Sequence, residues 1–239
     1  MPQIFLSIII PAHNEEKRLP QSLQQIAGFL ENFHQPAEVI VVENGSSDAT
    51  LRVAQNFAAA RSHFRVLHNE LPGKGRAVQS GMLAAAGRYR FFADADLSMP
   101  IEQLPRFLPP AVDVPIAIAS REAPGAVRYN EPAHRHFTGR VFNTLIRSLV
   151  LPGLHDTQCG FKLFRDDVAA DLFRRQTLMG WSFDVELLYI ASLRGLPILE
   201  VPIPWYFNPE SKINVGRDSW RMFRDLLEIR RNGRLGRYA

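Results

Sequence analysis

Short apolar runs alternate with amphipathic stretches throughout the first half of the chain, and this alternation restricts the fold more than any other feature. The runs are rich in β-branched residues and read FLSIIIP, EVIVVE, FRVLH and YRFFADAD, while helical patterns begin near Glu15, Asp48 and Gly75. Strands and helices alternating at this spacing form parallel sheets with right-handed crossovers. The sequence therefore predicts an α/β fold with a mostly parallel central sheet flanked by helices.

The second half is less regular but contains the same kinds of element. Strand-like runs read VPIAIAS, GFKLF and ILEVPIPWYF, and helical patterns read HRHFTGRVFNTLIRSLVL and SFDVELLYIASLRG, the latter with Ser182 as its expected cap. No linker or internal repeat separates the halves, and 239 residues suit one core. We therefore expect both halves to share one sheet.

Composition narrows the class of protein. No stretch approaches the roughly eighteen apolar residues that a membrane span needs, so we expect a soluble or peripheral protein of the cytoplasm. The single cysteine, Cys159, excludes an intrachain disulfide. From Arg217 to Ala239, seven arginines outnumber three acidic residues, which accounts for the whole formal net charge of +4. Such a tail suits an anionic surface, and it is equally compatible with a solvated helix face.

Polar residues follow three of the expected strands, at the sheet edge where α/β folds bind ligands. Alternation along an extended chain places Asp94 and Asp96 on the same side. Two such carboxylates suit Mg²⁺ or Mn²⁺ held jointly with phosphate oxygens. Because the D-x-D pattern also arises often by chance, a metal site and a plain strand end both remain open on this pattern alone.

The stretch LPGKGRAV places Gly73, Lys74 and Gly75 directly before an expected helix. It matches neither a P-loop nor a dinucleotide fingerprint. Glycines that expose backbone N–H groups, a helix N-terminus and a lysine all favour an anion. The simpler alternative is a tight turn without a ligand.

A series of stretches resembles the inverting nucleotide-sugar transferases of glycosyltransferase family 2, which have the GT-A fold. In chain order they are SIIIPAHNEE, VVENGSSD, GKGRAV, ADADLS, ASR, RHFTGR, DTQCGFKLF, WSFDVELLYIA and ESKINV. DTQCGFKLF and WSFDVELLYIA are the most specific. They are similar to the dolichyl-phosphate β-glucosyltransferase branch, with dolichyl-phosphate mannose synthases as near relatives.

The resemblance assigns the first strand ends to the nucleotide. Residues matching the family's first nucleotide-binding loop are Pro11, Ala12, Asn14 and Glu15. Glu43 falls where most members have an Asp that contacts the nucleoside. These residues are therefore expected to bind the nucleoside of a nucleotide sugar.

The resemblance also assigns residues to the diphosphate. Gly73 and Lys74 match the segment that lies over the nucleotide, and Asp94 and Asp96 match the family's D-x-D signature. Asp96 is expected to be the stronger ligand of Mg²⁺ or Mn²⁺. Asp94 is expected to serve as a second ligand, to contact the ribose or to hold the site in shape.

Matches in the second half concern the acceptor. Arg121 and Arg135 match basic residues that hold the acceptor phosphate, and Lys212 matches a mobile loop that closes over the site. Asp184 matches the family's acidic acceptor-side position. Because a lipid phosphate is already largely ionised at neutral pH, Asp184 is expected to position groups more than to remove a proton.

Together these matches imply a metal-dependent enzyme that moves glucose from UDP-glucose to a polyprenyl (dolichyl-type) phosphate at the cytoplasmic membrane face. They imply one GT-A domain, with a nucleotide-sugar and metal-binding half at about 1–110, an acceptor-binding half at about 111–216 and a basic amphipathic helix and tail at 217–239. In that tail, Trp220, Met222, Phe223 and Leu227 alternate with arginines, as expected of a helix on an anionic membrane surface.

Two other functions remain compatible with the sequence. One is transfer of mannose from GDP-mannose to the same acceptor. The other, of a different class, is a non-catalytic protein that binds a nucleotide sugar or a membrane. Nucleic acid is not an expected partner, because no recognised binding motif accompanies the basic tail.

Overall fold

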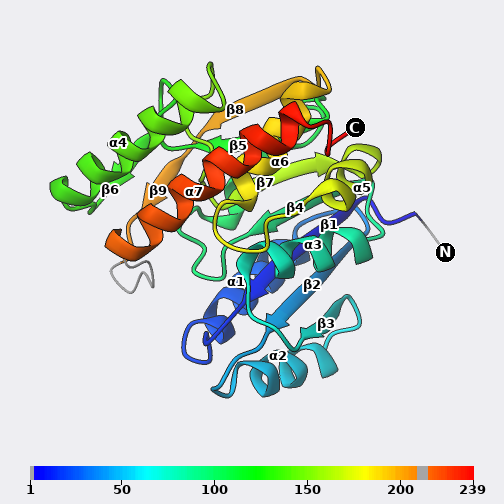
Figure 1. Ribbon diagram of the computed structural model, residues 1–239. Coiled ribbons are helices and arrows are strands. Elements are labelled where there is room, and N and C mark those ends of the chain that lie inside the picture. The colour runs from blue at the N-terminus through cyan, green and yellow to red at the C-terminus, as the bar shows by residue number, and fades with distance from the viewer. Residues whose placement is uncertain (1–2, 209–214) are drawn as a thin grey trace.

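The computed structural model describes residues 3–208 and 215–239, and within them one seven-stranded sheet crosses the molecule (Figure 1). Its strands are β1 (Leu6–Ala12), β2 (Ala37–Asn44), β3 (Phe64–Asn69), β4 (Tyr89–Ala93), β5 (Ile116–Ser120), β7 (Phe161–Arg165) and β8 (Ile198–Pro202). They lie in the order β3-β2-β1-β4-β7-β5-β8. Every neighbouring pair is parallel except those of β7, which runs antiparallel to β4 and β5. The predicted mostly parallel sheet is confirmed, and strands of both halves share it.

The central strands are buried on both faces, as continuous apolar runs in parallel sheets require. Along β1, Ile8 and Ile10 belong to one core cluster, while Ile9 belongs to the other. The period-two alternation of a strand thus divides one apolar run between two cores. Both cores are closed by helices.

Helices cover both faces of the sheet. They are α1 (Leu19–Glu31), α2 (Thr50–Ala59), α3 (Lys74–Ala84), α4 (Ala133–Leu149), α5 (Asp166–Arg175), α6 (Phe183–Leu193), α7 (Val215–Arg234) and the short 3₁₀ helix η1 (Ile101–Phe107). Helices α1, α2 and η1 pack on one face, whereas α3, α5 and α6 pack on the other. Helix α7, orange to red in Figure 1, packs beside α6 and buries Leu226 and Ile229.

Two helix starts differ from the sequence prediction. Helix α1 begins at Leu19 rather than near Glu15, and Pro20 occupies its first turn, where the missing N–H of a proline costs no helical hydrogen bond. Ser182 occupies the N-cap position of α6, but its hydroxyl donates to Asp225 of α7 at 2.6 Å instead of capping the helix. This bond ties α7 to the start of α6.

A small parallel sheet lies apart from the main one. It pairs β6 (Val127–Tyr129) with β9 (Pro204–Tyr206), and the rings of Tyr129 and Tyr206 stack with centroids 4.7 Å apart. In the part of the chain that the structure describes, no helix combines the length and the apolar character needed to cross a membrane.

Candidate active site

A cavity of about 670 Å³ opens at the carboxyl ends of β1, β2 and β4. This is the edge at which parallel sheets bind ligands. Its walls come from the segments that follow these strands, from the start of α3, from residues 177–181 and from α7. Of the predicted site residues, the walls contain Pro11, Glu15, Gly73, Lys74, Asp94 and Asp96.

Lys74 and Asp94 form an ion pair inside this cavity. The Lys74 Nζ lies 2.6 Å from Asp94 Oδ1, and it also lies 5.3 Å from the centroid of the Trp181 ring. Burial alone would lower the pKa of Lys74, but the charges of Asp94 and Asp184 outweigh it and hold that pKa above its ordinary value. Lys74 therefore stays protonated and presents a positive charge to the cavity.

Asp96 lies in the same cavity without a cationic partner. Its Oδ1 accepts the Ser98 backbone N–H at 3.1 Å, and no basic side chain of the described residues lies within ion-pair distance. Burial raises the pKa of Asp96, and the negative charge of Asp94 raises it further. An added cation would therefore relieve an unfavourable charge at this position.

The residues present fit a divalent cation that the substrate helps to bind. Within residues 3–208 and 215–239, no group of three or more His, Cys, Asp or Glu side chains could enclose a metal on its own. Mg²⁺ and Mn²⁺ are, however, commonly held by one or two carboxylates plus phosphate oxygens. Asp94 and Asp96 supply this donor set.

Hydrogen bonds join the loop after β1 to the loop after β2. Asn14 adopts a left-handed φ of 54°, and its side-chain oxygen accepts the Ser47 N–H at 2.8 Å. The Glu15 N–H donates to the Thr50 hydroxyl at 2.7 Å. Asn14 and the buried Ala12 do not line the cavity, so their nucleotide contacts stay predictions.

Glu43 is fully buried and does not line the cavity. Its carboxylate accepts the Ser46 N–H at 2.5 Å and contacts His68 Nδ1 at 2.5 Å. Although burial opposes ionisation, these hydrogen bonds hold the pKa of Glu43 below its ordinary value. The cavity is instead lined by the neighbouring Asn44, whose side-chain oxygen accepts the Gly73 N–H at 2.7 Å. A nucleoside contact by Glu43 stays a prediction.

Three backbone N–H groups at the start of α3, those of Gly73, Gly75 and Arg76, already have acceptors within the protein. The Gly75 and Arg76 N–H groups donate to the carbonyls of Gly180 and Met179, each at 3.3 Å. Gly73 has a φ of 149°, and a side chain there would meet the Met179 carbonyl at 2.6 Å. Segment 177–181 therefore covers the turn, and the Lys74 side chain is the group that this turn offers to an anion.

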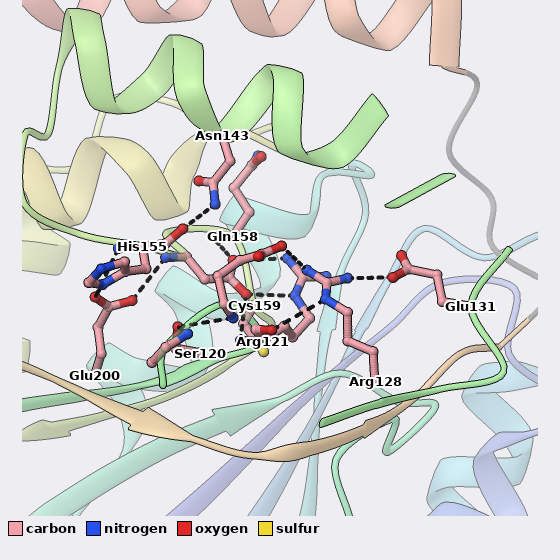
Figure 2. A network of polar contacts seen from close by, with 12 residues as sticks. Ser120, Arg121, Arg128, Glu131, Asn143, His155, Gln158, Cys159 and Glu200 are labelled. Carbon is pink, nitrogen blue, oxygen red and sulfur yellow. Dashed lines mark hydrogen bonds and ion pairs between the residues drawn. The ribbon is translucent and has the colours of Figure 1, made fainter. Parts of the chain in front are cut away.

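Arg121 lies outside the cavity wall in a buried polar network (Figure 2). Its Nε and Nη2 donate to the two carboxylate oxygens of Asp156 at 2.6 and 2.9 Å. Burial opposes charge on both groups, but Arg121 lowers the pKa of Asp156 to about 2. The role of Arg121 toward an acceptor phosphate stays a prediction, because its charge is already compensated in this structure.

The other acceptor-side predictions have different positions. Asp184 is buried beneath the cavity, where its Oδ1 accepts a 2.7 Å hydrogen bond from Lys162. Burial raises the pKa of Asp184, and the charges of Lys162 and Lys74 oppose that rise. The side chain of Arg135 and the whole of Lys212 lie outside the described residues. The roles of all three stay predictions.

Comparison with known proteins identifies the family. Residues 7–173 match the sequence model of a protein family described as "Glycosyl transferase family 2". The chain belongs to glycosyl transferase family 2. It is therefore a glycosyltransferase, and its relatives place it more closely within the family.

The chain is similar to curated family 2 enzymes over most of its length. It is 38% identical to the dolichyl-phosphate beta-glucosyltransferase of Drosophila melanogaster, over 95% of this chain and 75% of the relative. It is 36% identical to the enzyme of that name from Homo sapiens, over 96% of this chain and 76% of the relative. It is 32% identical to the enzyme of that name from Saccharomyces cerevisiae, over 99% of this chain and 77% of the relative.

Solved structures share the GT-A fold with this family 2 enzyme. Mannosyl-3-phosphoglycerate synthase from Rubrobacter xylanophilus aligns with a TM-score of 0.70 at 18% identity, over 98% of this chain and 75% of that one. Glucosyl-3-phosphoglycerate synthase from Mycobacterium tuberculosis, in complex with Mn²⁺, UDP and phosphoglyceric acid, aligns with a TM-score of 0.67 at 17% identity, over 99% of this chain and 79% of that one. At these identities the likeness concerns the fold.

The stretch DTQCGFK supports the cavity of this family 2 enzyme from behind. Asp156 holds Arg121, and Lys162 donates to Asp184 at 2.7 Å and to the Cys159 carbonyl at 2.5 Å. Gly160 leaves room for Asp94, because a Cβ at Gly160 would overlap the Asp94 carboxylate.

Sequence reasoning missed several residues of the cavity wall. They include His13, Arg18, Arg76, Thr177, Leu178, Met179, Gly180 and Asp225, and Arg221 was assigned to a surface helix instead. The segment 177–181 is anchored by the Glu186 carboxylate, which accepts the Thr177 and Leu178 N–H groups at 3.0 and 2.8 Å. The sequence signal was that residues 177–180 directly precede WSFDVELLYIA, of which Trp181 is the first residue.

Proposed function

We propose that this family 2 enzyme transfers glucose from UDP-glucose to a polyprenyl phosphate, with inversion at the anomeric carbon and with Mg²⁺ or Mn²⁺. The observation that carries the proposal is that Lys74, Asp94 and Asp96 converge in one cavity at the carboxyl edge of the sheet. A volume of about 670 Å³ suits a nucleotide sugar. The names of the relatives support glucose as the sugar and dolichyl phosphate as the acceptor.

On the donor side, the chain's own residues hold and neutralise the leaving group. Asp96 and Asp94 would hold the cation, which when bound supplies positive charge against the departing diphosphate. Lys74 is protonated and donates to diphosphate oxygens at the same place. The ion pair with Asp94 holds that ammonium in place before the substrate arrives, so little reorganisation is needed.

On the acceptor side, a phosphate oxygen forms the new bond to the anomeric carbon while the bond to the diphosphate breaks and its electron pair leaves with UDP. Because the acceptor phosphate is already ionised, no strong base is required. Asp184, held by Lys162, is suited to positioning. Basic groups must bring two anions together, which is the role proposed for Arg121, Arg135 and Lys212.

The donor is tested by incubating the purified enzyme, MnCl₂ and a short polyprenyl phosphate with radiolabelled UDP-glucose or GDP-mannose. We expect label in the lipid extract from UDP-glucose and its loss when EDTA removes the metal. Label from GDP-mannose alone would contradict the donor assignment. Binding of UDP-glucose without transfer to lipid would instead favour the non-catalytic alternative.

We also propose that α7 lies on an anionic bilayer at the cytoplasmic face. Trp220, Arg224, Leu227 and Arg231 recur at helical spacing along it, and all four are exposed. The opposite side buries Leu226. A stripe of apolar and basic side chains on a helix with one buried face suits a peripheral membrane contact.

Replacing Arg224 and Arg231 by Ser should weaken cosedimentation with vesicles containing phosphatidylglycerol by roughly thirtyfold, at about 1 kcal/mol per basic residue. Arg221 is left unchanged because it lines the cavity. The matched control replaces the exposed Arg52 and Arg147 by Ser, with no expected effect. Equal sedimentation of the α7 variant and the control would contradict the membrane contact.

A further inference from the structure

One buried carboxylate, that of Glu186 in α6, holds segment 177–181 of the cavity wall from behind. Its Oε2 accepts the Thr177 and Leu178 N–H groups at 3.0 and 2.8 Å, and its Oε1 accepts the Thr177 hydroxyl at 2.5 Å. Because Glu186 is fully buried, its carboxylate is stable only while donors of this kind surround it. The position of the wall segment therefore depends on how well Glu186 is hydrogen-bonded.

Tyr238 supplies a further donor to the same carboxylate from a distant part of the chain. Its hydroxyl donates to Glu186 Oε1 at 2.8 Å. Burial and the negative charge of Glu186 raise the pKa of Tyr238, so this hydroxyl stays protonated and remains a donor. Tyr238 itself is buried and does not line the cavity. Any influence of Tyr238 on a bound nucleotide must therefore pass through its neighbours in the wall.

The chain turns back after α7 to place Tyr238 in this position. Gly236 has a left-handed φ of 67° in this turn. Arg175, at the end of α5, donates from Nη1 to the Tyr238 carbonyl at 3.2 Å. The ring of Tyr238 meets that of Tyr189 in α6 edge-on, with centroids 6.3 Å apart. Contacts with α5 and α6 thus fix residues 235–239.

On its cavity side, segment 177–181 contacts the start of α3. The Arg76 N–H donates to the Met179 carbonyl at 3.3 Å. The Lys74 Nζ lies 5.3 Å from the centroid of the Trp181 ring. A displacement of the segment would therefore change the surroundings of the Lys74 ammonium, which the proposed mechanism assigns to the diphosphate.

We propose that Tyr238 is a positioning residue of this glycosyltransferase, which keeps segment 177–181 in place around the nucleotide site by donating to Glu186. While the segment covers Glu186, the carboxylate depends on protein donors. When the segment opens, water reaches the carboxylate and replaces them. Loss of the Tyr238 hydroxyl thus costs the covered form more than the open form and shifts the balance toward opening.

Tyr238→Phe tests the proposal because it removes the hydroxyl and keeps the ring that packs on Tyr189. In the ligand-free protein, amide hydrogen exchange of residues 177–181 should become roughly tenfold faster, as expected for loss of a hydrogen bond to a charged group, while exchange along β1 stays unchanged. Calorimetry should show binding of UDP with MnCl₂ weakened by roughly threefold or more, where the choice of UDP rests on the proposed function. Tyr206→Phe, at an exposed tyrosine outside the cavity wall, is the matched control and should change neither result.

A second variant tests the same connection from its other end. Arg175→Gln removes the donor to the Tyr238 carbonyl without touching Glu186, and it should also accelerate exchange of residues 177–181. In combination, Arg175→Gln and Tyr238→Phe should accelerate exchange by less than the product of their separate effects, because both act through one contact.

Unchanged exchange of residues 177–181 in Tyr238→Phe would overturn the assignment. Equal acceleration along β1 would overturn it too, because Tyr238 would then stabilise the whole fold rather than this wall. Faster exchange of residues 177–181 with unchanged UDP binding would show that the segment does not shape the nucleotide site, which also contradicts the proposal. Failure of the proposed function is separable: if the unaltered protein does not bind UDP, the proposed donor is refuted, and the exchange results alone decide whether Tyr238 holds the wall.

Discussion

Asp96→Asn should lower the rate of glucose transfer by at least about a thousandfold while the protein stays folded. The substitution keeps the size of the side chain and its acceptor oxygen for the Ser98 N–H, so packing is preserved. It removes the carboxylate that the proposed mechanism assigns to the cation. Loss of several kcal/mol of transition-state charge stabilisation corresponds to about three orders of magnitude in rate.

The melting temperature of Asp96→Asn without metal distinguishes a loss of metal binding from a loss of folding. Burial and the charge of Asp94 raise the pKa of Asp96, which means that its negative charge is unfavourable in the folded protein. Removing that charge should therefore leave the melting temperature unchanged or raise it. The stabilisation that MnCl₂ and UDP give to the wild type should be lost.

Kinetics and thermal melting of Asp96→Asn measure both effects, with Asp113→Asn as a control because Asp113 is exposed outside the cavity wall. The control should match the wild type in both. Full activity in Asp96→Asn would refute the metal assignment, and a large fall in its metal-free melting temperature would show that the carboxylate supports the fold.

The sheet could be predicted from the sequence because its signal is local. Each strand is a short apolar run between helical patterns, and the continuous apolar run of β1 indicates burial on both faces. Segments without such a pattern were missed, among them η1 and α5. Helix α5 follows β7 without an intervening turn, so the boundary between the two carried no glycine or proline signal.

The site could be predicted only in part, because its contacts join segments far apart in the chain. Asp94 and Lys74 were found from motifs at strand and helix ends, and the structure brings them together. Nothing local to Glu43 shows that its carboxylate contacts His68 of the neighbouring strand β3. Likewise, the sequence of α7 gives no sign that Arg221 reaches the cavity, because that depends on how α7 packs against α6.

Lys162→Met should destabilise the protein by about 3 kcal/mol at neutral pH. The Lys162 side chain is fully buried, and its Nζ lies 2.7 Å from Asp184 Oδ1, whose side chain is only 4% exposed. Methionine fills a similar volume, so the loss comes from charge. Removing the ammonium leaves a buried carboxylate whose remaining cation is Lys74, which is itself paired with Asp94.

The pH dependence of this loss separates charge from packing. Burial raises the pKa of Asp184, so its contribution to stability is complete below the unfolded pKa of about 4 and declines as the pH rises toward the folded pKa. Loss of Lys162 raises that pKa further and extends the decline to higher pH. Urea unfolding of Lys162→Met should therefore show a larger deficit at pH 8 than at pH 5.

A second substitution, Asp184→Asn, tests whether the loss of stability in Lys162→Met comes from charge. In Lys162→Met combined with Asp184→Asn neither charge of this buried pair remains, so the deficit should shrink and become independent of pH between pH 5 and pH 8. Lys17→Met, at an exposed lysine, should match the wild type throughout. An equal deficit in the single and double variants would assign the loss to packing. If the stability deficit of Lys162→Met instead depends on pH, Lys162 keeps Asp184 ionised beneath the cavity. The charge of Asp184 in turn helps to hold Lys74 protonated.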